Sequence, residues 1–486
     1  MSSVLQRLFA VRSVDAIVQD LEKSPPLKRV LTAKSLTAIG LGSTIGTGIF
    51  ILTGTVAANH AGPALTLALL IAAIGSGLAA ICYAEFAAMI PVSGSAYTYA
   101  YATLGEAVAW FIGWNLFLEY MMSASAVAVG WSEYVVNLLG DWGVHFPQAL
   151  TNAPFGKTED GTLGLTGAIV NVPAVLIILV LGWVCYVGVR ETSTANNIMV
   201  VIKVAVIVVF VLAGLAFVDT SNWSPYIPPN SGKFGEFGWS GVLQGAGIIF
   251  FSYIGFDAAS TTAREARNPQ RDVPLGILGA LGISAVLYIA MAAVMTGMVP
   301  YPQLDAPAPV AVALDAHPEL AWLGHLVKLG AIAGMTSVVL MSLLGQPRIL
   351  LAMAADGLLP TAVSKVHPRY RTPHVATAWT VLVAALIAGL FPLDVLGELI
   401  SIGILLAFTM VCIGVLVLRF TRPDLERPFR VPAAPVTCVL GAMVCGGMTY
   451  FLPADTWWRL AIWTLLGFSI YALYGYRHSR LRTDGT

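Results

Sequence analysis

The sequence contains the stretch Gly40-Leu-Gly-Ser-Thr-Ile-Gly-Thr-Gly-Ile-Phe50, which places four glycines within nine residues. The surrounding segment is apolar enough to cross a membrane. Glycine weakens a helix interior by about 1 kcal/mol relative to alanine. Free backbone N–H and C=O groups are tolerated at membrane depth only where protein or a water-filled cavity satisfies them. The stretch therefore predicts a broken transmembrane helix whose exposed backbone groups bind a polar substrate near the bilayer midplane.

The composition is that of a polytopic membrane protein. Of the 486 residues, 57% are hydrophobic and 11% charged, and the mean hydropathy is +0.79, whereas a soluble domain carries about 25% charged residues. The 26 basic and 26 acidic side chains cancel, so no net field favours nucleic acid as a partner. The five cysteines lack CxxC spacing, which predicts neither disulfides nor a metal site. No cofactor is expected, because the glycine-rich stretches lack nucleotide-binding context.

Apolar runs of about 20 residues, the length that crosses a bilayer, predict about twelve membrane spans. These runs cover residues 36–57, 64–84, 103–137, 168–188, 195–218, 239–262, 274–299, 322–347, 374–391, 394–418, 434–452 and 457–476. Of the 26 lysines and arginines, 21 fall on one side of this topology, three on the other side and two within spans. The positive-inside rule therefore makes both termini cytoplasmic. We expect a multi-pass protein of the cell inner (plasma) membrane without a removable signal peptide.

The sixth apolar segment is interrupted like the first, within Gly245–Asp257. If spans one to five and six to ten are repeats, their odd number gives them inverted topology, and the two broken helices face each other. The alternative is that these glycines only allow close helix packing. The predicted organisation is a cytoplasmic arm 1–34, a first repeat 35–218, a second repeat 239–418, two further spans within 434–476 and a cytoplasmic tail 477–486.

Several motifs spread along the chain are typical of one family. They are Gly46-Thr-Gly-Ile-Phe50, the loop Tyr83–Tyr97 with Pro91-Val-Ser-Gly94, Phe251-Ser-Tyr-Ile-Gly-Phe-Asp257, Glu265-Ala-Arg-Asn-Pro-Gln270 and Gln346–Gly357. From about Lys34 to about Arg430 the chain resembles the amino acid-polyamine-organocation (APC) superfamily, and it is most similar to bacterial members of the cationic amino acid transporter subfamily. The resemblance implies a LeuT-like fold: an all-α membrane protein with broken helices 1 and 6 in a five-plus-five inverted repeat, plus two extra helices.

The same resemblance implies a substrate site at the two predicted breaks. Thr47 and Gly48, with the neighbouring amide of Gly46, would hold the substrate α-carboxylate, which agrees with the preference of half-helix N-termini for anions. The α-ammonium would bind the backbone carbonyls of three residues: Thr44, Phe251 and Ile254. Phe251 matches the family's aromatic gate. The alternative for its side chain is lipid contact or core packing.

Four charged groups lie within the predicted spans, where each costs at least about 2.5 kcal/mol at the bilayer centre. Lys203, roughly 12 Å into segment five, matches the buried lysine that replaces a sodium ion in proton-coupled relatives. Glu119 and Asp257 would support proton coupling, and Glu119 could instead contact a cationic side chain. The alternatives are a static lysine paired with carbonyls and carboxylates in structural hydrogen bonds. We expect Lys328 to snorkel to the outer interface.

These observations predict a secondary active transporter, a proton-coupled L-amino acid symporter that imports its substrate by alternating access. Small neutral amino acids such as alanine, serine or threonine would be favoured, with cationic ones weaker or dependent on Glu119. The alternative is an amino acid exchanger without proton coupling. A channel would need a continuous polar pore, and an enzyme would need a clustered nucleophile and base or metal ligands, which the sequence lacks. The expected partners are an L-amino acid, protons and membrane lipid; no accessory membrane subunit is identified.

Overall fold

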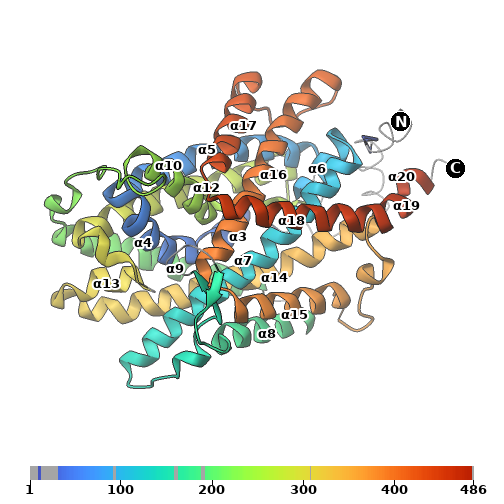
Figure 1. The fold of residues 1–486 in the computed structure, drawn as a ribbon. Coiled ribbons are helices and arrows are strands. Elements are labelled where there is room, and N and C mark those ends of the chain that lie inside the picture. The colour runs from blue at the N-terminus through green and yellow to red at the C-terminus, as the bar shows by residue number, and fades with distance from the viewer. Residues whose placement is uncertain are drawn as a thin grey trace.

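Long helices that run roughly side by side make up most of the computed structural model (Figure 1). The structure describes residues 9–12, 31–90, 95–157, 163–187, 192–306, 308–370 and 372–483. Most of the predicted arm 1–34, the turn Pro91–Gly94 and the last three residues of the predicted tail lie outside the described residues.

A helix lies within each of the twelve stretches that hydropathy predicts. The helices are α3 (Ala33–Thr44), α5 (Leu65–Met89), α7 (Glu106–Asp141), α8 (Val172–Val187), α9 (Thr192–Gly214), α10 (Gly238–Ile249), α12 (Pro269–Met298), α14 (Ala321–Ala355), α15 (His374–Leu390), α16 (Leu393–Thr421), α17 (Ala434–Tyr450) and α18 (Ala454–Ile470). Proline or glycine stands at the start of several helices. Proline suits the first helical position. Pro269 begins α12, and Gly105, with φ of 95°, directly precedes α7.

The first and sixth stretches are both interrupted, as predicted. In the first, α3 ends at Thr44 and a π-helix, η1 (Gly48–Leu52), continues the path, so that Ile45–Thr47 form what we call the first break. In the sixth, α10 leads into the 3₁₀ turn η7 (Phe250–Tyr253), and α11 (Ala258–Thr261) follows after Ile254–Asp257, the second break.

Helix contacts repeat with a shift of five stretches along the chain. Helix α3 packs on α12, and its counterpart α10 packs on α5. Helix α9 packs on α14, and its counterpart α16 packs on α7. The pairs α5 with α12, α7 with α14 and α8 with α15 each join an element to its own counterpart. The two breaks therefore lie between α7 and α14 on one side and α5 and α12 on the other.

Six helical stretches within the described ranges are long and apolar enough to cross a membrane. The number becomes seven if α17 and α18, which are bent by 108° relative to each other, count as one span. Helices α8 and α15 are apolar but only 16 and 17 residues long, shorter than the ~20 residues of a full span. A polytopic helical membrane protein is thus confirmed, and the number twelve stays a prediction.

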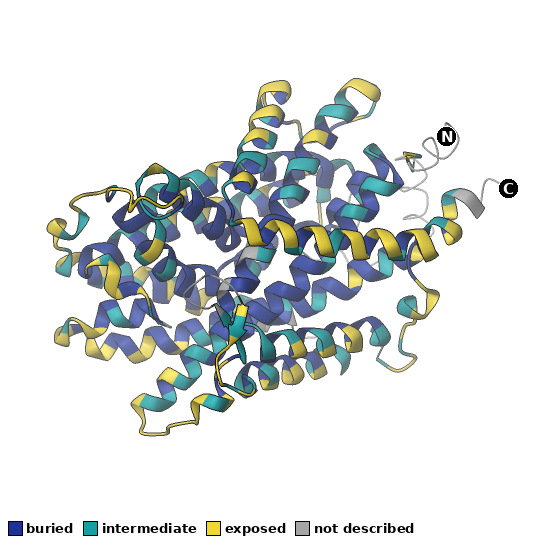
Figure 2. Ribbon diagram, viewed as in Figure 1, coloured by how far each residue is buried: buried dark blue, intermediate teal, exposed yellow. Residues whose placement is uncertain are grey.

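Burial separates a central from a peripheral set of helices (Figure 2). Most of α7 and α14 is buried, whereas α8, α15 and α18 expose one face. The exposed side chains on these outer helices are large and apolar, such as Trp183 on α8 and Trp458 on α18, which are 65% and 72% exposed. Apolar side chains on an outer surface suit contact with lipid tails. Shorter elements absent from the hydropathy prediction are α6 (Ser95–Thr103), α13 (Pro309–Asp315) and an antiparallel hairpin, β1 (Phe155–Lys157) with β2 (Leu163–Leu165).

Candidate functional site

The first break leaves backbone donors without backbone partners. Ile45 has ψ of 103°, outside the helical range. The amides of Ile49 and Phe50 both donate to the carbonyl of Gly46, at 3.2 and 3.3 Å. The amides of Gly46 and Thr47 donate to no backbone carbonyl of the described chain. These amides lie at the start of a helical segment, where unpaired N–H groups and the positive end of the helix dipole favour an anion.

The second break exposes backbone acceptors and depends on a glycine. The carbonyl of Phe251 accepts from the amide of Ile254 at 3.2 Å, and Ile254 then turns to an extended conformation with ψ of 144°. Gly255 has φ of 109°, a conformation that only glycine adopts without strain. A carbonyl has two lone pairs, so the carbonyl of Phe251 keeps the capacity to accept a second donor.

The two breaks contact each other through their glycines. A Cβ atom on Gly48 would lie 2.6 Å from Cα of Ser252, and one on Gly255 would lie 2.7 Å from the carbonyl carbon of Ser43. Both distances are far below van der Waals contact. The backbones of the two interrupted stretches therefore approach each other closely, and a larger residue at either position requires the neighbouring backbone to shift.

A small cavity lies at this contact, and all six predicted substrate residues line it: Thr44, Gly46, Thr47, Gly48, Phe251 and Ile254. The same cavity is also lined by Ser43, Ser123, Val127 and Val338. The Oγ1 atom of Thr47 is buried there without a hydrogen-bond partner in the described chain; Oγ of Ser252, beside Gly48, is likewise unpaired but does not line the cavity. Unsatisfied buried polar atoms point to a missing polar ligand or water. The cavity thus combines unpaired main-chain donors with the unpaired hydroxyl of Thr47.

The carbonyl of Thr44, one predicted acceptor for a substrate ammonium, already has a partner. The hydroxyl of Tyr288 on α12 donates to it at 3.0 Å. Because one lone pair remains, an ammonium group has to share this oxygen with the tyrosine or replace it. Sequence reasoning missed Tyr288, which is far from both breaks along the chain and is brought to them only by the packing of α3 on α12.

A second cavity adjoins the first. It is lined by Ser43, Glu119, Tyr120, Ser123, Ile254, Gly255, Ala258, Met341 and Ser342. Glu119 is 3% exposed, and its Oε2 atom has no hydrogen-bond partner in the described chain. Ser123 and Ser342 were not among the predicted site residues. A signal existed for Ser123, because it lies one helical turn beyond Glu119 and therefore on the same face of its helix.

Lys203 connects three elements at the first break. Its Nζ atom donates to the carbonyls of Gly42 and Ile45 at 2.7 and 2.8 Å and to Oγ of Ser337 on α14 at 3.0 Å. The side chain is completely buried. Ser337 also donates to the carbonyl of Gly42, at 3.1 Å. Lys203 therefore pairs with two carbonyls of the broken first stretch and with Ser337, and its role in proton coupling stays a prediction.

Asp257 lies at the end of the second break, directly before α11. It is fully buried, and neither carboxylate oxygen has a hydrogen-bond partner of good geometry in the described chain. The hydroxyls of Ser95 and Tyr120 lie nearby, and Glu119 is close enough to interact with it electrostatically. A fully buried carboxylate without a donor is costly in its ionised form. Asp257 lines neither cavity, so it adjoins the site without entering it.

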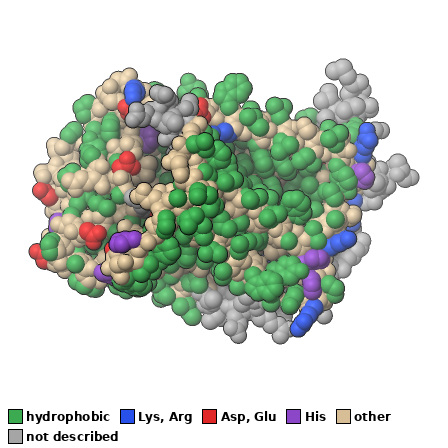
Figure 3. Space-filling view, turned by 60° about the horizontal axis from the view of Figure 1, so that its bottom comes forward, with side chains coloured by type: hydrophobic (Ala, Val, Ile, Leu, Met, Phe, Trp, Pro, Cys, Tyr) green, Lys and Arg blue, Asp and Glu red, His purple; other side chains and the backbone are tan. Residues whose placement is uncertain are grey.

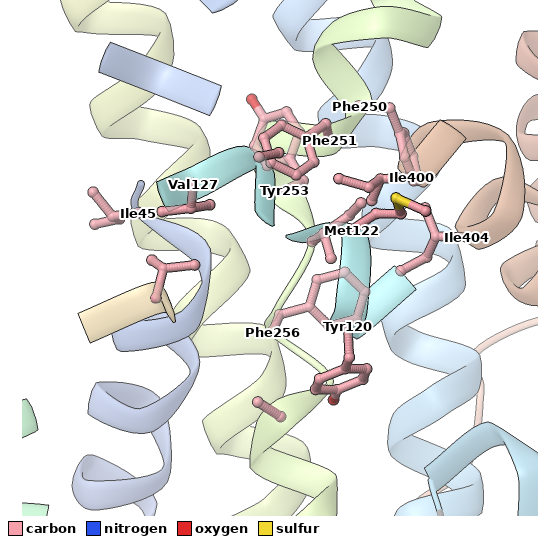
Figure 4. Close-up of a cluster of buried hydrophobic side chains, with 14 of the residues drawn as sticks. Ile45, Tyr120, Met122, Val127, Phe250, Phe251, Tyr253, Phe256, Ile400 and Ile404 are labelled. Carbon is pink, nitrogen blue, oxygen red and sulfur yellow. The ribbon is translucent and has the colours of Figure 1, made fainter. Parts of the chain in front are cut away.

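Phe251 lies at the boundary between the first cavity and an aromatic and aliphatic cluster (Figure 4). It is 5% exposed and lies beside Tyr253, with Met122 below it in the view. Figure 4 also shows the unwound backbone between Tyr253 and Phe256, which belongs to the second break. The position of Phe251 in the lining of the first cavity is compatible with the predicted gate, and the gating role stays a prediction.

The prediction for Lys328 is wrong. Its side chain does not snorkel to the outer interface but is buried, at 5% exposure, and pairs with Oδ2 of Asp141 at 2.5 Å. His325 lies 3.6 Å from the same carboxylate oxygen. The ion pair joins the end of α7 to the beginning of α14, and a buried lysine with a carboxylate partner has no need to reach water.

Comparison with known proteins agrees with this geometry. The family model described as "Amino acid permease" matches residues 31–471. A methylthioribose transporter of Bacillus subtilis is 45% identical over 94% of this chain and 96% of its own length. The branched-chain amino acid permease BcaP of the same organism is 42% identical over 98% of this chain and 99% of its own length. The vacuolar cationic amino acid transporter 2 of Arabidopsis thaliana is 41% identical over 83% of this chain and 61% of its own length. The chain therefore belongs to the amino acid permease family of the APC superfamily and is a multi-pass membrane transporter, not an enzyme.

Proposed function

We propose that this protein imports L-amino acids together with protons by alternating access, with small neutral amino acids favoured over cationic ones. The α-carboxylate binds the unpaired amides of Gly46 and Thr47 beside Gly48, and the α-ammonium binds the carbonyls of Thr44, Phe251 and Ile254. Support comes from the first cavity, which all these residues line. Such a main-chain site recognises the zwitterionic core and leaves the choice of side chain to the rest of the lining.

Proton coupling is inferred from one observation, the contacts of Lys203. A charged Nζ holds α9 and α14 against the carbonyls that the first break frees. Loss of the proton removes the charge from these hydrogen bonds and weakens them. The two protonation states then favour different arrangements of α3 relative to α9, which is the requirement for coupling protonation to a conformational equilibrium. Glu119 and Asp257 are the carboxylates that we assign to the same proton pathway.

The proposed topology has twelve spans, with residues 35–218 and 239–418 as inverted repeats of the LeuT-like type and both termini in the cytoplasm. Support for the repeats comes from the helix contacts that recur after five stretches. Support for the orientation comes from the face that Figure 3 shows, on which most lysine and arginine side chains lie toward the end of the molecule that carries both termini in Figure 1, and the acidic side chains visible on that face lie mostly toward the opposite end. Basic residues mark the cytoplasmic side, here of the plasma membrane.

The test is uptake of labelled amino acids into proteoliposomes under a proton gradient, a sodium gradient or neither. The wild-type protein is expected to accumulate alanine only under the inward proton gradient. Lys203→Ala removes three hydrogen bonds and the titrating group, so it should lose accumulation entirely while still binding substrate. The matched control is Lys328→Ala, which also removes a buried lysine from the membrane region but lies at the Asp141 pair, away from the break.

Three results contradict the coupling mechanism. They are accumulation driven by sodium, undiminished proton-driven accumulation in Lys203→Ala, and equal loss of accumulation in both lysine variants. Uptake that requires an amino acid inside the liposomes and ignores the proton gradient supports the exchanger instead. The relatives named for branched-chain and cationic amino acids define the substrate panel: alanine, serine, threonine, valine, leucine, lysine and arginine.

A further inference from the structure

Helices α7 and α14 face each other across the two cavities and carry side chains of the same character at matching levels. The two series are Val127, Ser123 and Glu119 along α7 and Val338, Ser342 and Gln346 along α14. The valines line the first cavity, the glutamate lines the second, and Ser123 lines both. Each step is four residues, so the wall changes from apolar to hydroxylic to carboxyl or carboxamide over about 12 Å.

The serine pair at the middle level is directed into this space. Ser342 donates to Ser123 at 3.4 Å, the long limit of a hydrogen bond. Other hydroxyls on these helices instead donate back to the preceding turn, a common arrangement for serine and threonine in helices. Ser125 donates to the carbonyl of Met121 at 2.8 Å, and Thr336 donates to that of Ile332 at 2.7 Å. Ser123 and Ser342 make no such bond, so their hydroxyls remain available to a ligand.

Beyond the long bond that joins them, the two serines keep unused hydrogen-bonding capacity, and one oxygen of the neighbouring carboxyl group has no partner in the described chain. In the described part of the chain, the hydroxyl hydrogen of Ser123 has no acceptor. Oε2 of Glu119 has no donor there either. Each serine is 7% exposed and Glu119 is 3% exposed. Buried polar groups that stay unpaired are costly. A ligand hydroxyl offers one donor and two acceptor lone pairs, so it can accept from Ser123 while donating to Ser342 or to the carboxyl group of Glu119.

We propose that Ser123 and Ser342, with Glu119 behind them, form a hydroxyl-binding subsite, so that this transporter prefers amino acids whose side chain carries a hydroxyl group over isosteric apolar ones. The proposal rests on the proposed amino acid transport. Ser43 and Ser123 line both cavities, which places the subsite within reach of a short side chain from a zwitterion anchored at the breaks. A long cationic side chain has to pass the serine level before it reaches Glu119, and the serines offer its aliphatic stem no apolar wall.

The test compares threonine with valine, which have the same shape and differ by a hydroxyl in place of a methyl group. Each competes with labelled alanine for uptake by the wild-type protein in proteoliposomes, with serine against alanine itself as a second pair. Threonine is expected to inhibit at a concentration about tenfold lower than valine, because a site with buried hydrogen-bonding groups rejects an analogue that leaves them unpaired. In the Ser123→Ala/Ser342→Ala double variant, the ratio should fall to about one or reverse.

The matched control is Ser125→Ala, on the same helix but with its hydroxyl bonded to Met121 and Ala384. It should keep the wild-type ratio. The proposal is overturned if valine competes as well as threonine with the wild-type protein, or if the double variant keeps the wild-type preference. If the wild-type protein takes up labelled methylthioribose but no labelled alanine, the proposed function itself fails. The comparison of threonine with valine on the wild-type protein needs no variant. It therefore tests the proposal even if the double variant does not fold.

Discussion

At the scale of single residues, Gly48 shows how the absence of a side chain determines the site. Its Cα approaches Ser252 so closely that an added Cβ would lie 2.6 Å from Cα of that residue. A larger residue at position 48 therefore forces the two interrupted stretches apart. The amides of Gly46 and Thr47, which we assign to the carboxylate, belong to the same short segment, so their positions depend on this contact.

Gly48→Ala should weaken the binding of every substrate by about tenfold or more, whatever its side chain. Overpacking at such a site costs about 1–3 kcal/mol, and about 1.4 kcal/mol corresponds to a tenfold loss of affinity. The measurement is equilibrium binding of labelled substrate to the purified protein. Gly77→Ala on α5 is the control, because a Cβ at Gly77 meets no atom within 4 Å. Wild-type affinity in a monodisperse Gly48→Ala protein would remove the basis for the carboxylate assignment.

Which residues the sequence could identify depends on how far apart their partners lie. The glycines of both breaks and the charges of Lys203, Glu119 and Asp257 are anomalies within apolar stretches, so each can be recognised without knowledge of its neighbours. Tyr288, Ser337 and Ser342 cannot be recognised in this way, and Ser123 is marked only by its spacing of one helical turn from Glu119. Tyrosine and serine are common in helices, and their roles here arise from the packing of helices that are far apart along the chain.

At the scale of elements, the start of the first interrupted stretch and the end of the sixth are tied together by main-chain hydrogen bonds. Leu31, two residues before α3, forms a parallel β-bridge with Ala266, beyond the second break. The amide of Leu31 donates to the carbonyl of Glu265 at 3.0 Å, and the amide of Arg267 donates to the carbonyl of Leu31 at 2.8 Å. With the Gly255–Ser43 contact at the other end, α3 and α11 are joined at two levels and can move as one body.

A disulfide in Leu31→Cys/Ala266→Cys should therefore leave proton-driven uptake within about twofold of the reduced protein, because bridged β residues have Cα atoms at a separation that a disulfide spans. Uptake is measured before and after oxidation and again after reduction. Each single-cysteine variant, which retains the five native cysteines, serves as the control for oxidation elsewhere. Uptake that stops on oxidation and returns on reduction would show that Leu31 and Ala266 must separate during transport.

Hydropathy predicted the position of each long element, since a helix lies in each of the twelve apolar stretches. It could not predict α6, α13 or the β-hairpin, because these elements are far shorter than the ~20-residue apolar runs that mark membrane spans. The number of spans also depends on more than hydropathy. The short helices α8 and α15 and the bend between α17 and α18 make length alone an incomplete criterion.

At the scale of the whole molecule, both terminal segments meet at one end of the helix bundle. Arg12 pairs with Asp356 at 2.6 Å, and the amide of Arg480 donates to the carbonyl of Asp356 at 3.1 Å. Glu106, at the start of α7, accepts from Tyr471 at 2.5 Å and from Ser479. The last part of the chain thus holds the ends of α7 and α14, the two helices that form the walls of the site.

Truncation after His478 should lower the midpoint of thermal unfolding by several degrees without changing substrate affinity. The truncation removes the hydroxyl that Ser479 donates to the buried carboxylate of Glu106, and leaving a buried group underbonded costs about 1–3 kcal/mol. The measurement is thermal unfolding in detergent together with substrate binding. Truncation after Thr483 is the control, because it keeps Ser479 and Arg480. An unchanged midpoint in the shorter protein would show that the tail adds no stability.

The close contact of the two breaks has a consequence for how such a protein changes its cargo over evolutionary time. The anchor that we propose for the zwitterion is made of main-chain atoms, which are the same whatever residues surround them. The walls that meet the cargo's variable end are side chains on α7 and α14, where a substitution leaves the anchor in place. Such a transporter can therefore acquire a new substrate through a few substitutions on two helices. Each intermediate in that series still binds amino acids.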